Sequence, residues 1–122
     1  MNGRTAYLDT SAFLKLIVAE PESQALGRFL RRWPLRATAT LLRTETVRAL
    51  RRTGHDAELS VAHRLFRALR FIRIDEPLLD QAGGLDPREM RTLDAIHLSA
   101  ALALGSDLGV FVTYDGRLAE AA

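Results

Sequence analysis

Residues 5–12 read TAYLDTSA, and this stretch is the clearest indication of the fold class of the chain. Its first four residues are typical of a short buried strand, which ends at Asp9. Thr10 and Ser11 then suit the N-terminus of a helix, whose apolar positions continue toward Pro21. A strand that leads directly into a helix predicts the crossover units of an α/β fold.

The same alternation of short apolar runs and helical segments continues to the end of the chain. Further strands are predicted over residues 36–40, 71–74 and 110–113. Further helices are predicted over residues 22–32, 41–53, 57–69, 78–82, 92–104 and 116–122. Strands separated by helices require crossover connections, which place neighbouring strands parallel. The predicted fold class is therefore α/β, with a short, mainly parallel sheet sandwiched by helices.

Composition narrows the class of protein without identifying it. The 122 residues suit one domain, and a content of 48% hydrophobic and 26% charged residues is typical of a globular protein. Cysteine is absent, which excludes disulfides and thiolate metal sites. No apolar run approaches the roughly 20 residues that cross a bilayer and no secretory signal begins the chain, so a cytoplasmic protein is expected.

The basic residues are almost all arginines, since Lys15 is the sole lysine among 17 basic residues. The planar guanidinium group suits contacts to phosphate, which is compatible with nucleic-acid binding. A GC-rich coding sequence explains the same preference, and the net charge is only +2. The arginine content alone therefore decides nothing.

Four acidic residues are predicted to gather at one edge of the sheet. Asp9 and Asp115 lie at or just beyond the ends of two predicted strands. Asp94 lies in the first turn of a helix, and Glu45 lies about one turn into the helix after the second strand. The carboxyl ends of parallel strands share one edge of the sheet with the helices that begin there, and ligands usually bind at this edge. All four acids are therefore candidates for one pocket.

Four carboxylates in one pocket need a counter-charge, because they repel each other and burial disfavours their ionised forms. A hard divalent cation supplies this charge, and oxygen ligands without cysteine favour Mg²⁺ or Mn²⁺. Such an ion lowers the pKa of a bound water and neutralises phosphate oxygens. Phosphodiester hydrolysis is therefore the chemistry that the four acids predict.

Each acid also has a purely structural interpretation. Asp94 suits the dipole of a helix that begins near it, and Asp9 suits a helix N-cap. Asp115 precedes a glycine, as is typical of a turn, and Glu45 is in reach of Arg48 on the same helix. Only the joint placement of the four acids favours a catalytic site over these interpretations.

Four blocks of the sequence resemble the motifs of PIN domains, and in particular of VapC-type toxins. They lie in the expected order at residues 7–12 (YLDTSA), 42–50 (LRTETVRAL), 92–101 (TLDAIHLSAA) and 112–118 (VTYDGRL). The resemblance implies a PIN-like three-layer α/β/α sandwich and the activity of an Mg²⁺- or Mn²⁺-dependent endoribonuclease. It also implies the role of toxin in a type II toxin–antitoxin pair, a cognate VapB-type antitoxin, an RNA substrate and a homodimer.

The resemblance assigns a role to each of the four acids. Asp9 and Asp94 correspond to the principal metal ligands of the family. Asp115 corresponds to the carboxylate that coordinates the metal directly or through water. Glu45 corresponds to the acid that completes the site and orients or deprotonates the attacking water.

Five further residues have open interpretations. Ser11 and Thr113 match hydroxyl positions that hydrogen-bond the acids, although a helix cap and an ordinary strand residue explain them equally well. Arg48 and Arg91 lie near the acids in the motifs and are candidates for binding substrate phosphates, but an arginine beside a carboxylate is more often its charge partner. His97 lies on an apolar helix face and is predicted to be a packed, hydrogen-bonded core histidine rather than a catalytic one.

Other proteins that handle phosphate fit the sequence less well. A receiver domain also gathers acids around Mg²⁺, but it needs a lysine at the end of a late strand, and Lys15 lies in the first predicted helix. A haloacid-dehalogenase-type phosphatase needs a second aspartate two residues after the first, where Ser11 stands. The glycine-rich loop of a P-loop nucleotidase is absent from the sequence.

Two alternatives within the PIN family stay open. One is a nuclease of RNA processing outside a toxin–antitoxin system, and the other is a module that binds RNA or a partner without catalysis. A small chain with no appended RNA-binding module favours the toxin, and the presence of all four acids favours catalysis. A single domain over residues 1–122 is expected. PIN domains usually continue past the fourth block into another edge strand, and this domain is expected to lack that strand.

Overall fold

The structure is a computed structural model that describes residues 2–121. Its centre is a four-stranded sheet in which every pair of neighbouring strands is parallel. The strands have the order β3-β2-β1-β4 and comprise β1 Thr5–Leu8, β2 Leu35–Ala39, β3 Arg70–Ile72 and β4 Leu108–Val112. The predicted α/β class and the parallel sheet are confirmed.

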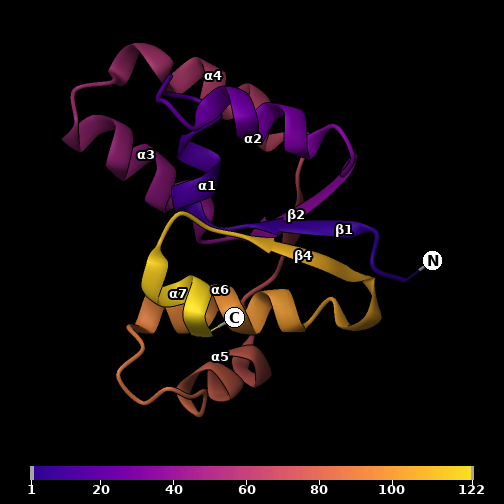
Figure 1. Ribbon diagram of the computed structural model, residues 1–122. Helices are drawn as coiled ribbons and strands as arrows, with labels where there is room; N and C mark the ends of the chain where they lie inside the picture. The colour runs from indigo at the N-terminus through magenta and orange to yellow at the C-terminus, as the bar shows by residue number, and fades with distance from the viewer. Residues whose placement is uncertain (1, 122) are drawn as a thin grey trace.

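Helices cover both faces of the sheet and complete a three-layer α/β/α sandwich (Figure 1). One layer contains α1 Thr10–Leu14, α2 Ser23–Leu30, α3 Leu42–Arg52 and α4 Leu59–Phe66. The opposite layer contains α5 Glu76–Gly83, α6 Thr92–Leu102 and α7 Gly116–Ala121. Short 3₁₀ helices precede α4 and β4, at Asp56–Glu58 and Gly105–Asp107.

Strand β1 is buried along its whole length, because helices pack on both faces of the sheet. Successive side chains of a strand point to opposite faces. Accordingly, Ala6 and Leu8 belong to one core cluster, whereas Tyr7 belongs to the other, together with Ala100 of α6. The two packed faces fix the register of β1, and with it the point at which Asp9 leaves the sheet.

Helix α1 begins as the structural interpretation of Asp9 predicted, but it ends earlier than expected. The N-cap is Asp9, whose side chain accepts a hydrogen bond from the N–H of Ala12, so Thr10 and Ser11 are the first two residues of the helix rather than its cap. The helix also ends at Leu14 rather than near Pro21. The next three backbone N–H groups bond to carbonyls three residues back, which tightens the chain into turns.

Within residues 2–121, β4 forms one edge of the sheet, and no further strand pairs with it. The additional edge strand that the resemblance suggested is therefore absent from this part of the chain. No helix within residues 2–121 is both long and apolar enough to span a membrane.

Gly109 in β4 allows this strand to lie close to the N-terminal segment and to Trp33. A Cβ atom at this position would lie 2.3 Å from the backbone oxygen of Gly3 and 2.3 Å from a ring carbon of Trp33. We expect Gly109→Ala to lower the free energy of unfolding by about 1–3 kcal/mol, because the Gly3 backbone and the Trp33 ring leave no room for the added methyl group. Urea unfolding followed by circular dichroism measures this change.

The matched control is Gly27→Ala in α2, where an added Cβ meets no heavy atom within 4 Å. This substitution is expected to be neutral or stabilising, because alanine favours a helix over glycine. A Gly109→Ala variant as stable as the wild type would show that β4 moves away from Trp33 without cost.

Candidate active site

All four predicted acids line one groove at the carboxyl edge of the sheet. Asp9 directly follows β1, and Asp115 lies between β4 and α7. Glu45 and Asp94 lie in the first turns of α3 and α6. The groove has a volume of about 740 Å³, and its lining also includes Ser11, Arg48, Arg91 and His97. The parallel topology therefore brings the acids together, although they come from four separate elements.

Asp9 is the most buried of the four acids and is held by three hydrogen-bond donors. Its exposure is 4%. Oδ1 accepts hydrogen bonds from the Ala12 N–H at 3.0 Å and from the Ser11 hydroxyl at 2.7 Å. Oδ2 accepts one from the Thr113 hydroxyl at 2.5 Å. Ser11 and Thr113 thus contact the acid beside which the sequence motifs place them, and together they fix the orientation of its carboxylate.

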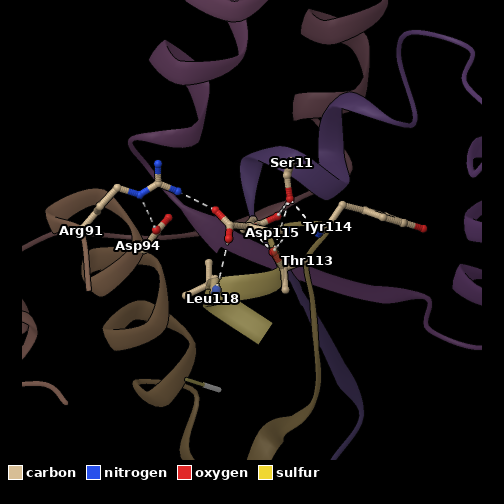
Figure 2. A network of polar contacts seen from close by, with 8 residues as sticks. Ser11, Arg91, Asp94, Thr113, Tyr114, Asp115 and Leu118 are labelled. Atoms are coloured by element: carbon tan, nitrogen blue, oxygen red, sulfur yellow. Dashed lines mark hydrogen bonds and ion pairs between the residues drawn. The ribbon is translucent and has the colours of Figure 1, made fainter. Parts of the chain in front are cut away.

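The same two hydroxyls also hold the chain that follows β4 (Figure 2). The Tyr114 N–H donates to the Ser11 hydroxyl at 2.8 Å, and the Asp115 N–H donates to the Thr113 hydroxyl at 3.0 Å. Asp115 in turn accepts a hydrogen bond from the Leu118 N–H at the start of α7, at 3.3 Å. Asp9 and Asp115 are therefore positioned by one network, which joins the ends of two adjacent strands.

Arg91 bridges the carboxylates of Asp94 and Asp115, as Figure 2 shows. Its Nε atom lies 3.1 Å from Oδ2 of Asp94, and its Nη2 atom lies 2.7 Å from Oδ2 of Asp115. The hydrogen bond to Asp94 is the main reason why the pKa of Arg91 is raised above its ordinary value. The Arg91 side chain is 62% exposed, so each ion pair contributes little to stability. Arg91 is thus a charge partner of the acids in this structure.

Glu45 contacts a buried histidine rather than an arginine. Its Oε1 atom lies 2.8 Å from Nε2 of His97 and accepts a hydrogen bond from the Thr10 hydroxyl at 2.7 Å. Nδ1 of His97 lies 2.7 Å from the hydroxyl of Tyr7. Burial raises the pKa of Tyr7 well above its ordinary value.

His97 is a packed and hydrogen-bonded histidine, as predicted, with an exposure of 3%. Its contact with Glu45 was not predicted from the sequence, and neither was the part that Thr10 and Tyr7 take in the same network. The only signal in the sequence was the spacing of three residues between Asp94 and His97, which places both on one side of α6.

Arg48 lies one turn after Glu45 on α3 and lines the groove with an exposed side chain. Within residues 2–121 no ion pair or hydrogen bond engages its guanidinium group, in contrast to that of Arg91. A positive charge beside the acids is therefore available to an anionic ligand.

The acids of the groove fit a divalent cation by their chemistry more than by their present spacing. Across residues 2–121, no three His, Asp or Glu side chains converge closely enough to hold a metal ion as they stand. The groove does offer several carboxylate oxygens and no thiolate, which is the donor set that Mg²⁺ and Mn²⁺ prefer. The guanidinium group of Arg91 shows that positive charge is favoured between Asp94 and Asp115.

Comparison with known proteins gives consistent results over nearly the whole chain. Residues 6–122 match the family model of the PIN domain, and this range contains all four acids. Ribonuclease VapC46 of Mycobacterium tuberculosis is 50% identical over 116 residues, which cover 95% of this chain and 88% of the relative. Ribonuclease VapC47 of the same species is 39% identical over 116 residues, which cover 92% of this chain and 85% of the relative.

The fold is also similar to a solved structure. The crystal structure of M. tuberculosis VapC20, a toxin that cleaves the sarcin–ricin loop, matches with a TM-score of 0.76 and 25% identity. The match covers 96% of this chain and 95% of that chain.

Proposed function

Because the chain belongs to the PIN-domain family, and within it to the VapC ribonucleases, we propose that its acidic groove is the active site of an endoribonuclease toxin. The proposed reaction is metal-dependent hydrolysis of phosphodiester bonds within an RNA strand. The observation that carries this proposal is the convergence in one groove of Asp9, Glu45, Asp94 and Asp115.

Three of the acids, Asp9, Asp94 and Asp115, are the proposed ligands of Mg²⁺ or Mn²⁺. When bound, such an ion lowers the pKa of a water molecule and neutralises charge on the phosphate. In this structure Arg91 forms ion pairs with two of these ligands, Asp94 and Asp115. These ion pairs have to break before the two carboxylates can bind a metal ion. Exposed ion pairs of this kind contribute at most about 1 kcal/mol each, so this release costs little.

Glu45 is proposed to orient the attacking water or to accept its proton. Its side chain is 23% exposed and borders the groove, while Thr10 and His97 hold its Oε1 atom. A general base has to lie at a defined distance from the proton that it accepts, so restraint of the carboxylate supports catalysis. Ser11 and Thr113 are proposed to restrain Asp9 in the same way.

Arg48 is the proposed contact to a phosphate of the RNA, and Arg91 becomes a second one when it leaves the acids. Both line the groove, and both present a guanidinium group that suits bidentate binding of phosphate. Arg48 is the stronger candidate, because it needs to break no ion pair before it binds.

Arg48→Ala is expected to raise the KM for RNA about tenfold while kcat changes little, because it removes one phosphate contact outside the proposed metal ligands. A plot of the logarithm of the RNA-binding constant against the logarithm of the salt concentration is expected to become less steep by about one unit. Arg51→Ala on the same helix is the matched control, since Arg51 does not line the groove. Equal KM values in the two variants would assign Arg48 a purely structural role.

We further propose a cognate VapB-type antitoxin as the partner of the chain and an RNA loop as its substrate. Unstacked nucleotides in loops expose the phosphodiester to a groove, whereas an A-form helix does not. The homodimer implied by the resemblance stays a prediction, which light scattering of the purified chain would test.

The decisive experiment incubates the purified chain, freed of any partner, with total cellular RNA and Mn²⁺ or Mg²⁺. Cleavage ends are mapped by sequencing, and EDTA and the Asp94→Asn variant serve as controls. Discrete cuts that disappear in both controls would support a metal-dependent ribonuclease and identify its substrate. Cuts that persist in EDTA would contradict the proposed metal dependence.

A binding module without catalysis is the second candidate function, and it requires no metal ion in the groove. Its specific motivation is that Arg91 bridges Asp94 and Asp115 in this structure. Bound RNA without cleavage at any metal concentration would favour this alternative.

A further inference from the structure

A continuous line of hydrogen bonds runs from the core of the sheet to Glu45. The Tyr7 hydroxyl lies 2.7 Å from Nδ1 of His97, and Nε2 of the same ring lies 2.8 Å from Oε1 of Glu45. Tyr7 is 0% exposed, whereas Glu45 borders the groove. His97 therefore links a fully buried residue to a proposed catalytic residue.

The position of the Tyr7 hydroxyl indicates which nitrogen of the His97 ring carries a proton. A phenol keeps its proton at neutral pH, since its ordinary pKa is about 10. A buried hydroxyl needs an acceptor for this proton, and Nδ1 of His97 lies at hydrogen-bond distance. A neutral imidazole that accepts at Nδ1 carries its own proton on Nε2.

Packing keeps the Tyr7 hydroxyl beside this acceptor. The Tyr7 ring stacks on Phe111, with ring centroids 5.2 Å apart and planes inclined by 9°. It also meets the His97 ring edge-on, at a centroid distance of 5.8 Å. The phenol therefore cannot turn away from His97 unless the core around it repacks.

The Nε2–H group of His97 then donates to Oε1 of Glu45. The Thr10 hydroxyl donates to the same oxygen at 2.7 Å. In the part of the chain that the structure describes, no hydrogen bond engages the other oxygen, Oε2. The two donors thus anchor one carboxylate oxygen of Glu45 and leave the second available for the reaction.

We propose that His97 is a positioning residue for Glu45 and that Tyr7 holds His97 in the tautomer that donates from Nε2. The effect on catalysis rests on the proposed function, because it requires Glu45 to act in RNA cleavage. The tautomer itself depends on neither RNA nor metal, so it can be tested separately.

The first test is ¹⁵N NMR of the imidazole rings in the protein without RNA or metal, at neutral pH. The chain has three histidines, and the ring signals missing from His97→Gln belong to His97. We expect a protonated Nε2 and an unprotonated Nδ1 in the wild type, and a mixture of tautomers in Tyr7→Phe. A proton on Nδ1 in the wild type, or identical spectra in Tyr7→Phe, would overturn the proposal.

The second test measures kcat and KM for RNA cleavage by Tyr7→Phe. This variant keeps the stacked ring and removes only the hydroxyl, so circular dichroism should match that of the wild type. We expect kcat to fall about tenfold, as when a supporting hydrogen bond of a site is lost, and KM to stay within about twofold. An unchanged kcat would show that Tyr7 does not act through His97 on Glu45.

A comparison of three variants separates positioning from packing. Tyr114→Phe makes the same change at an exposed tyrosine and is expected to keep the wild-type kcat. His97→Gln retains an N–H donor near the position of Nε2, so it is expected to be more active than His97→Leu. Equal activity of these two His97 variants would contradict the proposal. If the wild type cleaves no RNA, the proposed function fails, and the NMR spectra alone decide the tautomer.

Discussion

Asp94→Asn is expected to lower the rate of RNA cleavage at least about 100-fold, because even residues that only support a metal ligand typically contribute 10–100-fold. The substitution keeps the shape of the side chain but removes its charge, so it weakens binding of a divalent cation. Asp94 pairs with Arg91, whose side chain is 62% exposed, so little stability depends on this ion pair. The melting temperature should therefore stay close to that of the wild type.

Cleavage assays with Mn²⁺ and thermal unfolding measure the two effects. Asp80→Asn is the matched control, because Asp80 lies on α5 with an exposed side chain and does not line the groove. Wild-type cleavage by Asp94→Asn would remove Asp94 from the site. Loss of cleavage together with loss of fold would assign Asp94 a structural role instead.

Asp9→Asn is expected to lose cleavage to a similar extent and, in addition, to lose stability. The Asp9 carboxylate accepts hydrogen bonds from the Ser11 and Thr113 hydroxyls as well as from the Ala12 N–H. An amide group offers one acceptor atom instead of two, so one hydroxyl loses its partner in a buried position. The expected cost is about 1–3 kcal/mol in the free energy of unfolding.

Asp75→Asn provides a control for this stability loss. Asp75 is the N-cap of α5 and accepts a hydrogen bond from the Leu78 N–H at 3.0 Å, but it lies outside the groove. Asparagine caps a helix about as well as aspartate, so this variant should retain its stability. Urea unfolding compares the two. Equal losses in both variants would show that the hydroxyls add nothing to Asp9 beyond its role as a cap.

The order of the secondary-structure elements and the common edge of the acids follow from the sequence alone. Apolar periodicity distinguishes the strands from the helices, and the crossover rule then places successive strands parallel. Once the strands are parallel, residues just after β1 and β4 have to lie at the same edge. The convergence of Asp9 and Asp115 could therefore be predicted without knowing any contact between them.

Local helix boundaries were less predictable, because they depend on the hydrogen bonds of individual backbone groups. The apolar pattern after Thr10 continues past Leu14, yet the chain there forms turns. Likewise, the cap of α1 could not be chosen among three adjacent polar residues from propensity alone, since aspartate, serine and threonine all cap helices. The backbone dihedral angles of Asp9 decide it.

Which polar groups pair with each other was decided only by the tertiary structure. Arg91 reaches Asp115 across 24 residues of sequence, and Glu45 meets His97 across 52 residues. Such pairs depend on side-chain rotamers and on how α3 and α6 pack at the ends of the strands, and periodicity contains no information about either. The sequence thus determined which residues share the groove, whereas packing determined which of them hold one another in place.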